Sequence, residues 1–264
     1  MWARARLVKK FSLYNEREPK LDLEMSDSLK EDFELPPEQQ AIRDKCFHLS
    51  EAVVEFPKEE IETSIPERFE KIVSKFIDRI AIKTESESVT YAELSAMANQ
   101  VAFSLIERKR PNSGLVALYF ETSVSLIAAM LGALKGGKSF VVFDPSLPPP
   151  RVTTMLEDSQ AALLLTEPKN RIAAQGICRN LCEVDVLDFS NSAQVAIPLR
   201  IEVSPNAEAF LLYTSGSTGK PKGVVWSHRH LLHHARSHAI TSGISHQDRV
   251  ALLSSGTSNA VTNT

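Results

Sequence analysis

The first half of the chain switches between apolar positions spaced for a helix and short apolar runs typical of strands. Pro66 opens a segment with one apolar face, which predicts a helix. Its apolar positions are Phe69, Ile72, Val73 and Phe76. A short strand is predicted at residues 80–83. Thr90 precedes Glu93 by the spacing of a capping box, so a second, longer helix is predicted from there through Leu105.

The next segment predicts a β-α-β unit. Residues 115–120 form an apolar run typical of a buried strand, residues 124–135 read as a helix closed by Gly136-Gly137, and residues 139–143 as a second strand. A proline-rich loop then leads to a helix ending near residue 158. Further strands are predicted at 161–166, near 183–186 and at 209–213. This alternation predicts an α/β fold with a mostly parallel sheet flanked by helices.

Residues 1–50 lack such a pattern. The chain is basic from Met1 to Phe11 and then acidic from Glu16 to Glu38, and Pro36-Pro37 would break a helix there. We therefore predict a flexible extension or linker at 1–50, ahead of a folded region at 51–264. The same residues are also compatible with a transit peptide, with the tail of an upstream domain, or with a start codon placed too early, Met25 being the alternative start.

Composition narrows the function classes. The 264 residues carry a net charge of −3 and 43% are hydrophobic, which argues against a nucleic-acid or anionic-membrane partner. No apolar run approaches the roughly 20 residues needed to cross a bilayer, so no membrane partner is expected. Cys46, Cys178 and Cys182 are too few for a disulfide framework. They predict structural thiols in a reducing cytoplasm, and no metal site.

The strongest candidate for a functional site is the segment that follows the strand predicted at 209–213. The string is Thr214-Ser215-Gly216-Ser217-Thr218-Gly219-Lys220-Pro221-Lys222-Gly223. Backbone N–H groups of small residues and nearby hydroxyls can converge on an anion, and the two lysines supply the charge that a polyphosphate needs. The string matches neither a Walker loop, because Pro221 follows Gly219-Lys220, nor the dinucleotide G-x-G-x-x-G pattern. From composition alone, a flexible loop with solvated lysines is an equally good interpretation.

The full string from Tyr213 to Val224 resembles the signature loop of the adenylate-forming superfamily. That superfamily includes acyl- and aryl-CoA synthetases, luciferases and the adenylation domains of nonribosomal peptide synthetases. Residues 89–94 with Ala98-Asn99 resemble its "LTYxEL…AN" segment. The resemblance begins near Ile65 and runs to the end of the chain. It implies the incomplete large N-terminal domain of an adenylate-forming enzyme, truncated at residue 264.

A further segment indicates the subfamily. Residues 131–137 and 143–148, with Arg151, resemble the segment that amino-acid adenylation domains write as "LKAGGAYVPLDPxxPxxR". This favours a peptide-synthetase adenylation domain over a fatty-acyl-CoA synthetase. Lys138 and Val142-Phe143 depart from that pattern.

The resemblance implies a reaction and roles for individual residues. A carboxylic acid, above all an amino acid, would attack the α-phosphate of Mg-ATP to give an acyl-adenylate and pyrophosphate. The acyl group would then pass to a carrier protein's phosphopantetheine thiol. Residues 214–219 would wrap the β- and γ-phosphates, Lys220 and Lys222 would lend charge, and Gly223 would complete the loop. Thr214 and Lys222 are the implied catalytic residues, although Lys222 could instead fix the loop to the fold. The Mg²⁺ ligands would lie mostly beyond this chain.

A run of histidines follows the loop: His228, His230, His233, His234 and His238. Three of them recur at a spacing that can hold a metal on a helix, but no acid lies within the run. We therefore predict that these histidines lie on a solvent-exposed or structural face of a helix and do not form a metal site. By resemblance, His228 would stand just before a helix and shape the far side of the loop.

Three functions remain open from the sequence. The first is the N-terminal part of an amino-acid-activating enzyme, and the second is the same part of an acyl- or aryl-CoA ligase. The third is a non-catalytic remnant or interaction module. The segment resembling Tyr-Gly-Pro-Thr-Glu and the small C-terminal domain of the family are missing, so this chain alone is not expected to form an adenylate.

Overall fold

The structure is a computed structural model that describes residues 56–107, 114–189, 201–215 and 221–252. The chain divides into two units, Met1–Ser50 and Glu51–Thr264, and all described residues lie in the second. The predicted extension at 1–50 therefore lies outside the described residues and stays a prediction.

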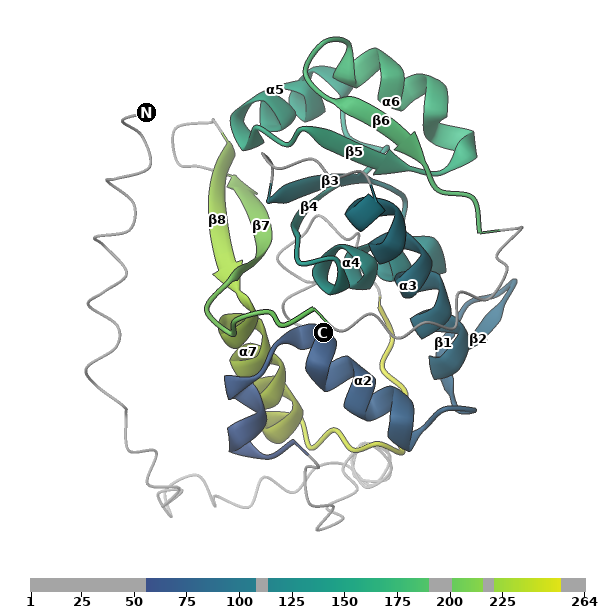
Figure 1. Cartoon of the computed structure of the whole chain (residues 1–264), viewed down its shortest axis with the longest axis vertical. Helices are drawn as coiled ribbons and strands as arrows, with labels where there is room; N and C mark the ends of the chain where they lie inside the picture. Colours follow the sequence, from purple (N-terminus) through teal and green to yellow (C-terminus); the bar gives the residue numbers. More distant parts are fainter. Residues whose placement is uncertain (1–55, 108–113, 190–200, 216–220, 253–264) are drawn as a thin grey trace, which may run out of the picture. The chain divides into compact units, whose positions relative to one another are not determined.

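A six-stranded sheet with strand order β6-β5-β3-β4-β7-β8 forms the centre of the second unit (Figure 1). Its strands are β3 (Leu115–Tyr119), β4 (Ser139–Phe143), β5 (Leu163–Thr166), β6 (Glu183–Val186), β7 (Glu208–Ser215) and β8 (Pro221–Ser227). Neighbouring strands are parallel except for β7 and β8, which pair antiparallel. The predicted α/β fold with a mostly parallel sheet is confirmed.

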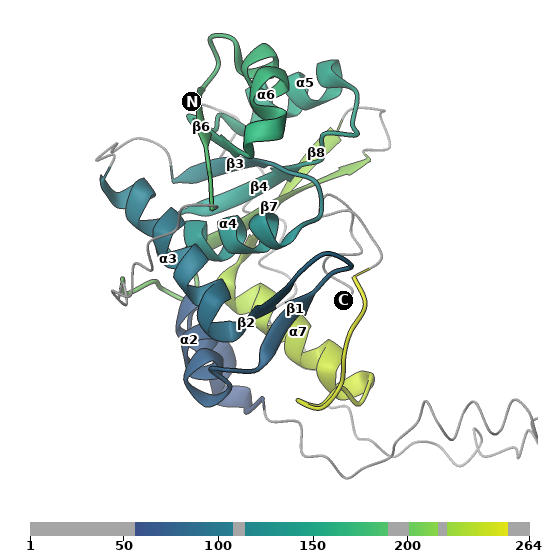
Figure 2. The ribbon, with the colours of Figure 1, turned by 90° about the vertical axis from the view of Figure 1, so that its right-hand side faces the viewer.

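Helices cover both faces of this sheet (Figure 2). On one side lie α2 (Ile65–Lys75), α3 (Tyr91–Glu107) and α4 (Val124–Lys135), and on the other lie α5 (Pro149–Ser159) and α6 (Arg171–Cys178). The other elements of the described residues are α7 (His228–Thr241), the short 3₁₀ helices η4 (Lys58–Glu62) and η5 (Pro168–Asn170), and a separate hairpin of β1 (Ile80–Lys83) and β2 (Ser88–Thr90). Within the described ranges, no helix combines the length and the apolar character needed to cross a membrane.

The alternation of side chains along β3 explains why both layers are needed. Val116 and Leu118 belong to the core that includes residues of α3 and α4, whereas Ala117 and Tyr119 belong to the core of α5 and α6. All four side chains are buried. A parallel strand that is apolar on both faces requires a helix layer on each side.

The predicted capping box at the start of α3 is confirmed. Oε2 of Glu93 accepts hydrogen bonds from the backbone N–H and the hydroxyl of Thr90, at 2.8 and 2.9 Å. In return, the Thr90 hydroxyl accepts from the Glu93 N–H at 3.2 Å. The backbone hydrogen bond from Thr90 lowers the pKa of Glu93. The helix therefore begins where the sequence pattern placed it.

A buried lysine joins three helices on one side of the sheet. Lys135, at the end of α4, is only 3% exposed. Its Nζ donates to Oγ of Ser95 and Oδ1 of Asn99, both on α3 and both at 2.8 Å, and it forms an ion pair with Glu70 of α2. Burial lowers the pKa of Lys135, and the Glu70 carboxylate opposes that shift. A charge removed from water in this way is tolerated because each of its partners is in place.

The prediction that Cys178 and Cys182 are thiols is wrong. The two residues form a disulfide, with their Cα atoms 5.4 Å apart. α6 ends at Cys178, and Arg179 adopts a positive φ of 43°, so the chain turns back toward the helix end within four residues. The number of cysteines did not reveal this disulfide, which depends on the chain turning back over four residues.

We expect Gly132→Ala to lower the free energy of unfolding by about 1–3 kcal/mol, because it overpacks the contact between α3 and α4. A Cβ at this position would lie 2.5 Å from Cβ of Val101 and 2.7 Å from the carbonyl oxygen of Ala98. Urea unfolding followed by circular dichroism measures the change.

Gly176→Ala is the matched control, because a Cβ there would meet nothing within 4 Å. Gly176 also lies inside a helix, so its replacement by alanine should raise the free energy of unfolding by about 0.5–1 kcal/mol. Equal effects of the two substitutions would contradict the close contact between α3 and α4.

Candidate functional site

The candidate phosphate-binding string lies at the tip of a β-hairpin. β7 and β8 pair in register through Tyr213 with Gly223, Thr214 with Lys222, and Ser215 with Pro221. Residues Gly216–Lys220 join these strands and lie outside the described residues. The sequence analysis did not predict the second strand, because it placed Pro221, Lys222 and Gly223 in the loop.

The hairpin continues past the end of its parallel partner. β7 pairs with β4 only through Phe210 with Phe140 and Leu211 with Val141. From Leu212 to Ser215, the backbone of β7 pairs with β8. Because β7 runs parallel to β4, the tip of the hairpin lies at the carboxyl edge of the sheet. That edge is the usual ligand-binding side of open α/β sheets.

Four of the nine predicted site residues fall within the described ranges. The structure brings Thr214 and Lys222 together, and the Thr214 hydroxyl lies 3.4 Å from the carbonyl oxygen of Lys222. The Lys222 side chain is exposed. Ser215 continues β7, and Gly223 lies against Leu211, whose Cδ1 would be 2.9 Å from a Cβ at that position. The predicted roles of Gly216, Ser217, Thr218, Gly219 and Lys220 stay predictions.

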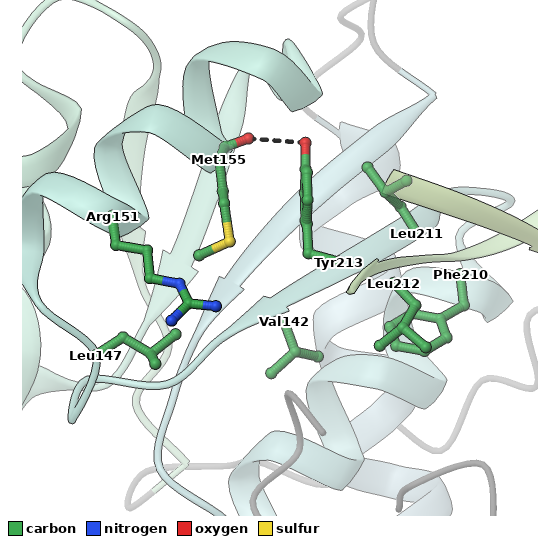
Figure 3. Close-up of a pocket in the computed structure, with 8 residues that line it drawn as sticks. All are labelled: Val142, Leu147, Arg151, Met155, Phe210, Leu211, Leu212 and Tyr213. Atoms are coloured by element: carbon green, nitrogen blue, oxygen red, sulfur yellow. Dashed lines mark hydrogen bonds between the residues drawn. The ribbon is translucent and has the colours of Figure 1, made fainter. Parts of the chain in front are cut away.

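A pocket of about 70 Å³ lies beside the stem of the hairpin (Figure 3). Its lining residues are Val142, Leu147, Arg151, Met155, Phe210, Leu211, Leu212 and Tyr213. Arg151 extends from α5 into the space between Leu147 and Met155 (Figure 3). Among the described residues, it is the only charged one that lines this pocket, so it places a positive charge beside the stem of the hairpin.

Tyr213 connects the stem of the hairpin to α5. Its hydroxyl lies 2.6 Å from Oδ2 of Asp158 and 3.0 Å from the carbonyl oxygen of Met155, and both oxygens accept from it. Its ring centroid is 6.4 Å from that of Phe143 on β4. Burial, and then the hydrogen bond to Asp158, raise the pKa of Tyr213 well above its usual range. No sequence signal indicated this contact, because Asp158 and Tyr213 are 55 positions apart.

His228 lies at the opposite end of β8 from the tip. It is the first residue of α7 and is 1% exposed. Its Nδ1 accepts a hydrogen bond from the N–H of Ile65 at 3.2 Å, which ties α7 to the start of α2. Burial lowers the pKa of His228 from 6.5 to about 4. The residue is therefore neutral near pH 7, with its proton on Nε2.

The other predicted histidines lie on α7 without forming a metal centre. His230 and His234 meet the ring of Trp226 edge-on, with centroids 6.5 and 5.8 Å away. Within the described part of the chain, no three His, Cys, Asp or Glu side chains gather in an arrangement that could hold a metal ion.

Comparison with known proteins identifies the family. A profile of the AMP-binding enzyme family matches residues 69–256. The chain belongs to the AMP-binding enzyme family. The resemblance on which the sequence analysis relied is therefore confirmed. The match spans most of the described residues, including the hairpin that carries the candidate loop.

Curated relatives of this AMP-binding chain include a gramicidin S synthase and a tyrocidine synthase. Gramicidin S synthase 2 of Brevibacillus brevis is 40% identical over 167 residues, which is 62% of this chain and 4% of that protein. Tyrocidine synthase 1 of Brevibacillus parabrevis is 33% identical over 193 residues, 73% of this chain and 18% of that protein. The chain thus spans less than a fifth of either relative.

Solved structures share the AMP-binding fold. The nonribosomal peptide synthetase FmoA3, in its α-methyl-L-serine-AMP bound form, superposes with a TM-score of 0.68 at 25% identity, covering 86% of this chain and 24% of that one. A luciferase-like enzyme from Zophobas morio gives a TM-score of 0.60 at 19% identity, covering 70% and 47%. At 19% identity, the likeness to the luciferase-like enzyme shows a shared fold alone.

We expect the stability of the protein to fall between about pH 6.5 and pH 4 because of His228. The folded-state pKa of about 4 lies below the ordinary value of 6.5, so the unfolded chain binds the proton first as the pH falls. His228 therefore makes the free energy of unfolding about 3 kcal/mol higher above pH 6.5 than at pH values below 4. Urea unfolding at several pH values between 4 and 7 measures it.

His228→Asn removes the titrating ring but keeps an oxygen that can accept from the Ile65 N–H. The variant should lose much of the pH dependence over this window. His233→Asn, at an exposed position on the same helix, should keep it. An unchanged slope in the His228 variant would contradict the assignment.

Proposed function

We propose that this chain is the N-terminal part of an enzyme that activates an amino acid as its adenylate. The observation that carries the proposal is the position of the signature string. Thr214 and Lys222 face each other at the tip of a hairpin, at the carboxyl edge of the sheet, in a chain of the AMP-binding enzyme family. The chain spans less than half the length of the relatives described above, so the activity belongs to a longer protein in those relatives.

The proposed reaction has two steps. A carboxylate oxygen of the substrate attacks the α-phosphorus of ATP, and the bond from that phosphorus to the bridging oxygen breaks, releasing pyrophosphate. A thiolate then attacks the acyl carbon, and AMP leaves. The second nucleophile would be the phosphopantetheine thiol of a carrier protein. Mg²⁺ would accompany ATP and neutralise part of its charge.

The described residues suit a polyphosphate. Lys222 is exposed and can approach an anion, and within the described residues the Thr214 hydroxyl makes a long contact, 3.4 Å, with the Lys222 carbonyl. Both groups stand next to the segment that would wrap the β- and γ-phosphates. Their role would be to hold the leaving pyrophosphate in line and to stabilise its developing charge.

An amino acid is favoured over other carboxylic acids as the substrate. The two curated relatives above are named gramicidin S synthase 2 and tyrocidine synthase 1, and the FmoA3 structure is named as a nonribosomal peptide synthetase bound to α-methyl-L-serine-AMP. The Asp144 segment that resembles amino-acid adenylation domains lies directly after β4, where Oδ1 of Asp144 accepts from the Ser146 N–H at 2.8 Å. An acyl- or aryl-CoA ligase is the alternative, and a cytoplasmic location without nucleic-acid or membrane partners completes the proposal.

In the complete enzyme of which this chain would be the N-terminal part, Lys222→Ala should lower ATP–pyrophosphate exchange by roughly tenfold to a hundredfold, because the loop loses a positive charge at the leaving group. The double variant Thr214→Ala/Ser215→Ala should fall by a similar factor. Exchange of labelled pyrophosphate into ATP, with each of the twenty amino acids and with benzoate as the aryl acid, gives both the activity and the substrate class.

Lys83→Ala is the matched control, since Lys83 is an exposed lysine on β1, outside the main sheet. It should retain the activity of the parent. If both hairpin variants exchange pyrophosphate as fast as the parent enzyme, the assignment of the loop is wrong. If the parent enzyme shows no exchange with any of the acids, the proposed function itself is wrong.

A further inference from the structure

The hairpin that carries the candidate loop has little backbone pairing with the rest of the sheet. Only two residue pairs connect β7 to β4, and both lie before Leu212. Beyond them, the backbone of β7 is paired with β8 alone. A two-stranded ribbon by itself is marginally stable in water, so side-chain contacts help to hold the stem in place. Leu212 is buried in the core of α3 and α4, and the Tyr213 ring packs against Phe143 of β4. A further contact, to a helix outside the sheet, adds to this support.

Tyr213 makes that contact one residue before Thr214. Its hydroxyl donates toward the Asp158 carboxylate at 2.6 Å and the Met155 carbonyl at 3.0 Å, as Figure 3 shows for Met155. The bond to Asp158 is charge-assisted and short, and it lies at the surface, where the Asp158 side chain is exposed. It joins the strand that feeds the loop to the last turn of α5.

α5 is a firm support for this contact. Val152, Met155 and Leu156 are each no more than 4% exposed and belong to the core between the helix and the sheet. The helix also follows the Asp144 loop directly, and Arg151 extends from it into the pocket beside the hairpin. The Tyr213 hydroxyl thus ties the stem of the loop to a helix that is itself fixed on the sheet.

We propose that the Tyr213–Asp158 hydrogen bond is a positioning contact for the phosphate-binding loop, and that it raises affinity for the triphosphate of MgATP. The inference rests on the proposed function of the loop. A stem that is already held loses less conformational freedom when the ligand binds, so the affinity is higher. Tyr213 and Asp158 need not touch the nucleotide to have this effect.

Tyr213→Phe tests the proposal because it removes the hydroxyl and keeps the ring. The Kd for MgATP, measured by titration calorimetry on the complete enzyme that contains this chain, should rise about five- to tenfold. The KM for ATP in pyrophosphate exchange should rise by the same factor, while kcat at saturating ATP should change less than about twofold. A residue that merely fills space would tolerate phenylalanine.

Three further variants separate this bond from a general loss of packing. Asp158→Ala should raise the Kd in the same direction as Tyr213→Phe but by no more, because the Tyr213 hydroxyl keeps the Met155 carbonyl as an acceptor. Asp158→Asn, which keeps an uncharged acceptor, should lie between Asp158→Ala and the parent. The double variant Tyr213→Phe/Asp158→Ala should be no weaker than Tyr213→Phe alone, because Asp158 has no hydroxyl left to accept from once Tyr213 is phenylalanine. Additive losses in the double variant would overturn the proposal.

Tyr119→Phe is the matched control. Tyr119 is also buried on the α5 side of the sheet, but it lies on β3 and not on the hairpin. This variant should keep the parent Kd. In hydrogen–deuterium exchange, peptides covering β7 and β8 should exchange faster in Tyr213→Phe and not in Tyr119→Phe.

The outcomes distinguish the two proposals. If the parent binds MgATP and Tyr213→Phe binds it equally well, the positioning contact is wrong and the function of the loop stands. Equal losses of affinity in the Tyr213 and Tyr119 variants also overturn it. If the parent binds no MgATP, both the proposed function and this inference fail.

Discussion

Burial of the central sheet on both faces is the constraint from which the rest of the arrangement follows. Because β3 and β4 are apolar on both sides, helices must cover each face, and α3 and α4 take one while α5 and α6 take the other. Polar side chains can then gather where the strands end without disturbing either core. Thr214 and Lys222 lie at such an end, beyond the last residues that pair β7 with β4.

The helix layers also hold the hairpin from two directions. On one side of the sheet, α5 meets the stem of the loop through Tyr213. At the far end of β8, His228 ties the start of α7 to the start of α2. Lys135 in turn links α2 to α3 and α4, so the anchor of the hairpin belongs to a layer with its own buried polar connections. Each attachment uses a side chain whose pKa is shifted by burial.

Sequence patterns predicted the elements whose signals are local. The helix at Val124–Lys135 and the strand at Ser139–Phe143 have the expected bounds, and the Thr90–Glu93 box forms as expected. The strand β8 was missed because Pro221, Lys222 and Gly223 are typical of a loop, and only pairing with β7 makes them part of a strand. The same holds for Asp158 and for the Cys178–Cys182 bridge, which depend on where the chain returns in space. A contact across 55 positions leaves no trace in local periodicity.

The hydrogen bond from Ile65 to His228 has a consequence for synthesis on the ribosome. The two partners are 163 positions apart, and Phe56 meets Arg236 across 180 positions. At 5–20 residues per second, the ribosome needs roughly 8–30 s to add 163 residues. During that interval, the first helices of this unit are made but lack their partner in α7. Their nascent apolar faces are therefore natural targets for chaperones that bind emerging chains.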